Sequence, residues 1–129
     1  MTSTLDTLGD SQYVSVTSYR RNGQGVPTPV WVVRDGDALA IWTPTGSGKV
    51  KRIRRDPAVL VAPCDFRGTL LGEPVGGRAA VLDAAATNRV RGLLKRKYGL
   101  IGRLTLIGSR LRRGRAGTVA IRIALADAE

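Results

Sequence analysis

The sequence of 129 residues contains no histidine and a single cysteine, Cys64. Without histidine, Ser-His-Asp and Cys-His catalysis and most zinc and non-haem iron sites are excluded, and a single thiol also excludes a cysteine-rich metal site. A lone cysteine also rules out an internal disulfide framework, which fits a reducing cytoplasm. We therefore expect no metal site and no assignable catalytic residue, with chemistry left to carboxylates, hydroxyls, lysines or a bound cofactor.

Long apolar runs are also missing, since no stretch approaches the roughly 18 residues that a membrane-spanning helix needs. The polar segment 1–10 carries Asp6 and Asp10 and does not resemble a signal peptide. The length and the 43% hydrophobic content are typical of one globular domain. We therefore expect a single cytoplasmic domain over residues 1–129, with no membrane contact.

Acidic residues are absent from Ala84–Ala126, and this segment accounts for the net charge of +11. A one-sided basic excess implies an anionic partner, which leaves nucleic acid, a phosphorylated cofactor or an acidic tail open; the alternative is a solvated face. Aromatic residues make up only 5% of the chain, and no helix-turn-helix, zinc or RNA-recognition signature appears. A nucleic-acid-binding module that uses the Arg89–Arg115 surface is therefore a distant alternative.

Apolar and polar residues alternate in several short segments, as in half-buried strands. This pattern predicts strands at Tyr13–Tyr19, Pro29–Arg34, Ala38–Thr43, Val59–Ala62 and Thr118–Leu125, with one bent strand or two in Thr69–Leu82. Helical spacing and capping residues predict helices at Leu5–Gly9, Lys49–Arg55, Ala84 to Gly99 behind Asp83, and Leu100–Ile107, followed by a basic loop over Ser109–Gly117. Tight turns between consecutive strands mean antiparallel pairing, so we expect a mainly β protein: a small barrel of six or more strands with α-helices.

The second predicted strand begins with two prolines, Pro27 and Pro29. Because proline cannot donate in a central ladder, this end is either an edge or a place where backbone faces a ligand. Trp31 and Trp42 lie on neighbouring strands and either fill the core or form the wall of a site for an aromatic ligand. Cys64 ends an apolar strand and is interpreted as a small buried hydrophobe.

A loop of small residues, Thr43–Gly48, precedes a segment in which five of seven residues are cations: Lys49, Lys51, Arg52, Arg54 and Arg55. It is not a P-loop, because Thr43 stands where that motif needs glycine and Val50 where it needs serine or threonine. A helix that begins near Lys49 nevertheless directs its positive end, and its cations, toward an anion. The segment therefore predicts a phosphate site, with a solvated surface helix as the alternative.

Five segments together resemble the pyridoxamine 5′-phosphate oxidase-like superfamily, and most closely its small, actinobacterial-type deazaflavin-dependent branch. The segments are Tyr13–Tyr19, Gly25–Val32, Ile41–Thr43 with Ser47–Ile53, Asp56-Pro57 and Ala62–Gly68. The resemblance implies a split β-barrel of the FMN-binding type that forms a homodimer, with the cofactor at the dimer interface.

The same resemblance implies which residues would hold the cofactor. Thr28, Pro29, Val30 and Trp31 would line the ring, with Trp42 and Thr43 beside it, while Ser47, Gly48, Lys49, Lys51 and Arg52 would hold the phosphate. An acidic cofactor tail would leave past Lys51, Arg52 and Arg55.

Two cofactors fit this pattern. Coenzyme F-420, an 8-hydroxy-5-deazaflavin, is expected in the branch that the chain resembles, and its hydride would pass to a small organic acceptor. One alternative is an FMN-dependent enzyme like pyridoxamine 5′-phosphate oxidase. A second alternative is a protein that carries or senses the cofactor without catalysing a reaction. No protein acid or base is needed for the hydride itself, and any proton would come from solvent or from a hydroxyl such as Tyr13 or Tyr19.

Overall fold

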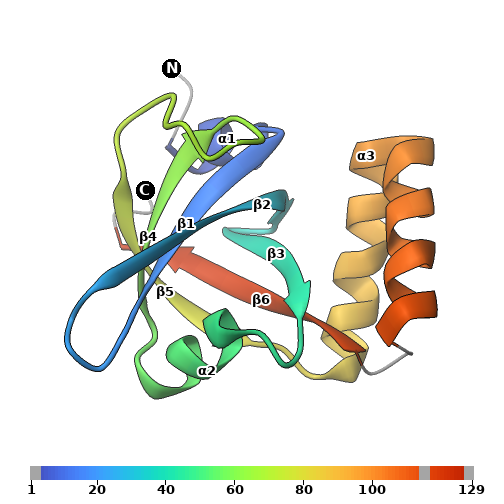
Figure 1. The fold of residues 1–129 in the computed structure, drawn as a ribbon. Coiled ribbons are helices and arrows are strands. Elements are labelled where there is room, and N and C mark those ends of the chain that lie inside the picture. Colours follow the sequence, from blue (N-terminus) through green and yellow to red (C-terminus); the bar gives the residue numbers. More distant parts are fainter. Residues whose placement is uncertain (1–3, 114–116, 127–129) are drawn as a thin grey trace.

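The computed structural model describes residues 4–113 and 117–126. Six strands close into a barrel in the order β1-β2-β3-β6-β5-β4, and each strand is antiparallel to both neighbours (Figure 1). They are β1 (Tyr13–Tyr19), β2 (Gly25–Asp35), β3 (Ala38–Pro44), β4 (Ala58–Cys64), β5 (Val75–Val81) and β6 (Thr118–Leu125). The predicted mainly β, antiparallel barrel is confirmed.

In the described part of the chain, three helices accompany the barrel: α1 (Thr4–Gly9), α2 (Gly48–Arg55) and α3 (Ala84–Arg113). In Figure 1, α2 lies at the lower end of the barrel and α3 stands beside it. The predicted cap of α3 is present, since the backbone N–H of Ala86 donates to Asp83 Oδ1 at 2.8 Å. Gly99, with φ 60° and ψ −140°, interrupts α3 where the sequence predicted a helix end. Within the described chain, no helix combines the length and the apolar character needed to cross a membrane.

The strands have two different faces, as their alternation predicted. Leu39 and Ile41 of β3 belong to the core inside the barrel, together with Val14 and Val16 of β1. Ala40, between them, packs on the outside with a second cluster that includes Val90 and Leu94 of α3. Burying one such leucine or valine contributes about 1.5–3 kcal/mol, so α3 is held on the barrel by a small core of its own.

The two prolines of β2 lie on a part of the strand that has only one neighbour. β2 pairs with β1 over Gly25–Trp31, but with β3 only over Val32–Asp35. Pro27 and Pro29, opposite Thr17 and Ser15, have no N–H to donate, so these are the non-hydrogen-bonded pairs of the ladder. Their carbonyl groups therefore point away from β1, and the predicted proline edge is confirmed.

Two side chains of α3 continue the hydrogen bonding of β2 at Val32, just past Trp31, which pairs with the first residue of β1. The N–H of Val32 donates to Tyr98 Oη at 3.1 Å, and this hydroxyl donates to the carbonyl of Gln12 at 2.6 Å. Burial raises the pKa of Tyr98 to about 12, so the hydroxyl keeps its proton. Lys97 Nζ donates to three backbone carbonyls at 2.6–2.7 Å, those of Gly9, Ser11 and Val32.

Two predictions of local structure are wrong in part. Within Thr69–Leu82 the strand β5 covers only Val75–Val81. Before it, a turn in which Asp65 Oδ1 accepts hydrogen bonds from the N–H groups of Arg67 and Thr69 leads to an isolated bridge between Leu70 and Cys64 of β4. The basic loop predicted over Ser109–Gly117 is helical through Arg113, since arginine and leucine are good helix formers. Residues 114–116 lie outside the described residues.

Replacing Lys97 by methionine should lower the free energy of unfolding by about 2–3 kcal/mol, because three carbonyls lose a charged donor. Denaturant unfolding of Lys97→Met against Lys95→Met, a change on the same helix, measures the effect. Equal stability of the two variants would show that the three carbonyls are satisfied without Lys97.

Candidate cofactor site at the barrel split

The barrel is split where β2 and β3 stop pairing. Beyond this point β2 keeps only β1 as a neighbour, and the end of β3, Trp42–Pro44, keeps only β6. We call these two one-sided edges the split. The loop that follows β3 is fixed by the N–H of Thr45, which donates to the carbonyl of Gly117 at 2.9 Å, and it leads directly into α2.

The N-terminus of α2 is capped by the side chain of Ser47. Ser47 is extended, with φ −68° and ψ 155°, and its Oγ accepts a hydrogen bond from the N–H of Val50. Val50 and Ile53 enter the barrel core, which fixes the rotation of the helix about its axis. The predicted helix is confirmed and begins one residue earlier, at Gly48.

A chain of polar side chains joins the end of β3 to the first turn of α2. Lys49 Nζ donates to Thr43 Oγ1 at 3.3 Å, and Thr43 Oγ1 lies 3.3 Å from Ser47 Oγ. Lys49 is only 8% exposed. Burial, and then the nearby Arg52 guanidinium, lower the pKa of Lys49.

Arg52 completes this group, which we call the α2 cluster: Thr43, Ser47, Gly48, Lys49 and Arg52. Arg52 Nε donates to Ser18 Oγ at 2.7 Å, and a Cβ at Gly48 would lie 2.6 Å from Arg52 Nη1. Because glycine has no Cβ, the Arg52 guanidinium can lie next to position 48. Among the described residues, no carboxylate forms an ion pair with Lys49 or Arg52.

The structure does not bring Lys51 and Arg55 into the α2 cluster. Lys51 is exposed and, two residues from Lys49, lies on the opposite side of the helix. Arg55 is exposed too and donates to the carbonyl of Tyr19, beside the turn between β1 and β2. Both cations face solvent next to the cluster.

The predicted ring-lining residues take different positions along the split. Thr28 is half-buried and donates from Oγ1 to the carbonyl of Val16 at 3.4 Å, Pro29 is exposed, and Val30 packs against the barrel core. The Trp31 ring stacks on Tyr98, with centroids 4.2 Å apart and planes 6° from parallel. Trp42 also packs beneath α3, with the Arg91 guanidinium 5.1 Å from its centroid. Both indoles thus pack against the second cluster between the barrel and α3, in agreement with the core position that the sequence left open for them.

Ser18 was not singled out by the sequence, although a signal was present. Val14 and Val16 point into the barrel, so Ser18, two residues further, occupies an inward position with a polar side chain and is 1% exposed. A hydroxyl at an apolar position of the pattern indicates a polar partner inside, and Arg52 is that partner.

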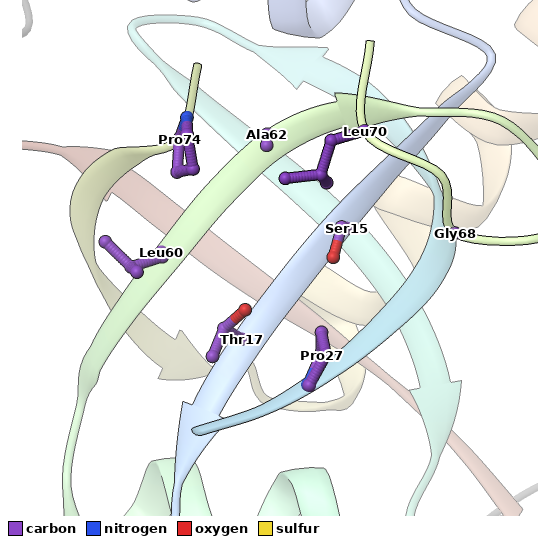
Figure 2. Close-up of a pocket in the computed structure, with 8 residues that line it drawn as sticks. All are labelled: Ser15, Thr17, Pro27, Leu60, Ala62, Gly68, Leu70 and Pro74. Carbon is purple, nitrogen blue, oxygen red and sulfur yellow. The ribbon is translucent and has the colours of Figure 1, made fainter. Parts of the chain in front are cut away.

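The outer face of β1 and β4 carries a hollow that sequence reasoning also missed. Its volume is about 240 Å³, and Figure 2 shows its lining: Ser15, Thr17, Pro27, Leu60, Ala62, Gly68, Leu70 and Pro74. A second hollow of about 420 Å³ is lined in part by Tyr13, Cys64 and Phe66. Large apolar side chains are exposed around both, and we call them the outer apolar face: Leu60, Phe66, Leu70 and Leu71. Cys64 itself is buried, as predicted.

Replacing Lys49 by methionine should raise the free energy of unfolding of the cofactor-free protein by about 1 kcal/mol, because a buried cation without a counter-ion is removed. The pKa of Lys49 is lower in the folded chain than its usual 10.5, so the unfolded chain binds more protons between the two values. The wild type should therefore gain stability as pH rises through that interval, whereas Lys49→Met should not. Denaturant unfolding across this pH range measures both effects, and a less stable variant at every pH would contradict them.

Comparison with known proteins places this geometry in a family. A search of curated proteins found no match to the chain. Solved structures with a similar fold include a conserved hypothetical protein of Mycobacterium tuberculosis, Rv2991, with 22% identity, 95% of this chain and 78% of that chain covered, and a TM-score of 0.68. An F-420 reductase has 18% identity and a TM-score of 0.64, and the match covers 98% of this chain and 96% of that chain. The heme storage protein HutZ of Vibrio cholerae has 8% identity and a TM-score of 0.68, and the match covers 93% of this chain and 85% of that chain. These likenesses concern the fold, whereas the sequence profile of the pyridoxamine 5′-phosphate oxidase family matches residues 3–129, and the chain therefore belongs to that family.

Proposed function

We propose that this protein is an oxidoreductase that binds coenzyme F-420 at the split and transfers a hydride between the cofactor and a small organic acceptor. The observation that carries the proposal is the α2 cluster, where a buried lysine and an arginine lie at a helix N-terminus and form no ion pair with a carboxylate of the described residues. An F-420 reductase among the structures of similar fold supports the choice of cofactor. FMN is the competing cofactor, since it also carries a phosphate.

The residues present fit a phosphorylated cofactor. Ser47, Lys49 and Arg52 offer one hydroxyl and two cations near the free N–H groups of α2, which is the donor set that a phosphate requires. Lys49 has a neutral hydroxyl as its hydrogen-bond partner, so a phosphate oxygen would add the charge that burial now leaves uncompensated. When bound, a deazaflavin supplies hydride transfer.

The remaining residues of the split act by position rather than by chemistry. The proline edge of β2 presents carbonyl groups and resists pairing with a further strand, so it stays open to a ligand. The stack of Trp31 on Tyr98 and the hydrogen bond from Val32 to Tyr98 hold this edge against α3. A rigid edge would hold a bound ring and its acceptor at a fixed distance and orientation, and this positioning accelerates the transfer.

Fluorescence titration of the purified protein with F-420 and, separately, with FMN tests the proposal. We expect tighter binding of F-420, with affinity at least about tenfold weaker in Lys49→Met, because a charge-assisted hydrogen bond contributes about 1.5–3 kcal/mol. Lys51→Met, which removes an exposed cation from the other side of α2, is the matched control and should change affinity little. Tighter binding of FMN would show that FMN, and not F-420, is the cofactor. Equal effects of the two substitutions would show that the α2 cluster does not bind the phosphate.

We also propose that a second copy of the chain covers the outer apolar face. Phe66 and Leu71 are 64% and 69% exposed and line the second hollow, whereas Leu60 and Leu70 line the first, so one surface carries both exposed apolar side chains and recesses. A twofold interface needs such a self-complementary surface. Exposure of this many large apolar side chains in one place is otherwise unfavourable in a monomer.

Light scattering after size exclusion should give twice the chain mass of 13.8 kDa for the wild type. Leu71→Arg should give a monomer, because a charge would be buried without a partner. Ala85→Arg, an exposed position on α3, is the control and should leave the dimer intact. A wild-type monomer at high concentration would exclude the interface.

A further inference from the structure

The hollow of about 240 Å³ on the outer face of β1 and β4 has a polar floor. This floor is β1, where Val16 points into the barrel and its two neighbours, Ser15 and Thr17, therefore point outward. Figure 2 shows both side chains standing on this face of the strand. Two hydroxyl groups of one strand thus enter the same hollow.

The walls of the hollow are apolar. Ala62 and Leu60 of β4 pair with Ser15 and Thr17 on one side of the floor, and Pro27 of β2 pairs with Thr17 on the other. None of the described residues that line the hollow carries a charge. The hollow therefore combines apolar walls with two neutral hydroxyl groups.

The loop after β4 forms the remaining wall and is held in place by its own hydrogen bonds. The N–H of Asp65 donates to the carbonyl of Thr69 at 3.0 Å, and the N–H of Leu71 donates to the carbonyl of Pro63 at 2.8 Å. Gly68 lines the hollow with a φ of 93°, a conformation that glycine adopts without strain. Because both ends of this loop are tied down, the hollow is formed before a ligand arrives.

The Ser15 hydroxyl gives an independent sign of a ligand. Ser15 is only 4% exposed, and its side chain forms no hydrogen bond with any described residue. Its Oγ is nevertheless not closed off from water, in contrast to Thr118 Oγ1, and the residue lines the hollow. A hydroxyl that is nearly buried, unpartnered within the described chain and accessible from the hollow fits a hydrogen-bonding atom of a molecule bound there.

We propose that this hollow binds a small, uncharged molecule of one ring, with an oxygen that accepts a hydrogen bond from Ser15 or Thr17. The volume exceeds the roughly 150 Å³ of an apolar cavity that takes up benzene, and it lies below the roughly 300–1,000 Å³ of sites for drug-sized ligands. A carboxylate or an ammonium group would lose water there without gaining a charged partner, so the ligand is neutral. The proposal does not depend on the cofactor bound at the split.

A second copy of the chain is the competing occupant, since Leu60 and Leu70 belong both to the hollow and to the outer apolar face. An apolar side chain inserted from a partner would contact the walls, but it would leave the Ser15 hydroxyl without a hydrogen bond and without water. That loss costs free energy, whereas the oxygen of a ligand would satisfy the hydroxyl. A second copy that covers the outer apolar face would then enclose the ligand rather than replace it.

Backbone amide shifts of the wild-type protein in titrations with acetophenone, ethylbenzene and benzoate test this site. Acetophenone and ethylbenzene share the ring and are similar in size, but only acetophenone has an oxygen, and benzoate adds a charge. Saturable shifts at Ser15, Thr17, Ala62 and Gly68 are expected with acetophenone. Ethylbenzene should bind at the same place more weakly, and benzoate should not bind there.

Ser15→Ala should weaken the binding of acetophenone about threefold to tenfold, the value of one neutral hydrogen bond, and leave that of ethylbenzene unchanged. Thr7→Ala, at an exposed position of α1, is the matched control and should change neither affinity. Ala62→Leu, which fills the hollow, should abolish the binding of both compounds. Thermal unfolding shows whether each variant is folded, and Ser15→Ala keeps the test decisive if Ala62→Leu is not.

The Leu71→Arg protein separates a ligand from a second copy, because Leu71 does not line this hollow. Binding of acetophenone by both the wild type and Leu71→Arg is expected. Binding by Leu71→Arg alone would show that a partner fills the hollow, and it would overturn the proposal. Shifts that do not saturate, equal affinities of the wild type for acetophenone and ethylbenzene, or tighter binding of benzoate would overturn it as well.

Discussion

Pro27 and Pro29, which have no N–H groups to donate, keep one edge of β2 without a second partner strand. Both prolines lie against β1 in non-hydrogen-bonded pairs, so the donors they lack are those that would have faced β3. Pairing between β2 and β3 ends at Val32, and the missing donors at Pro29 and Pro27 keep the ladder from resuming toward the start of β2. The edge that is left, the end of β3 and the start of α2 together form the place where a cofactor is proposed.

Two lysines of this protein illustrate why burial alone does not identify a functional cation. Burial lowers the pKa of both Lys49 and Lys97. Lys97 donates to three backbone carbonyls, so its charge is satisfied within the fold and holds α3 to β2. Lys49 donates to one neutral hydroxyl and lies near a second cation. The first arrangement stabilises the folded chain, whereas the second is favourable only when an anion is present.

The local sequence pattern was sufficient to predict structure where the partner of a residue is close in the chain or where its face follows from apolar–polar alternation. The bounds of β1 and β6, the division of β3 into two faces and the position of α2 to within one residue were predicted in this way. The roles of Lys97 and Tyr98 could not be, because their partners lie 65–88 residues away. The α2 cluster was predicted as a group of cations, but the rotation of the helix, which separates Lys51 from Lys49, depends on how Val50 and Ile53 enter the core. Where the rings of Trp31 and Trp42 lie was likewise decided by α3.

The cations whose side chains the structure describes include two kinds with different effects. Lys49 and Arg52 are at least half-buried and held by specific side chains, so an anion beside them would be little screened by salt. The exposed cations of α2 face solvent, where a Debye length of about 8 Å at physiological ionic strength weakens each pair. Their summed field attracts an anionic ligand and speeds its arrival without fixing its position. Affinity for a phosphate should therefore depend on the few buried cations, whereas the rate of its binding should depend on the many exposed ones.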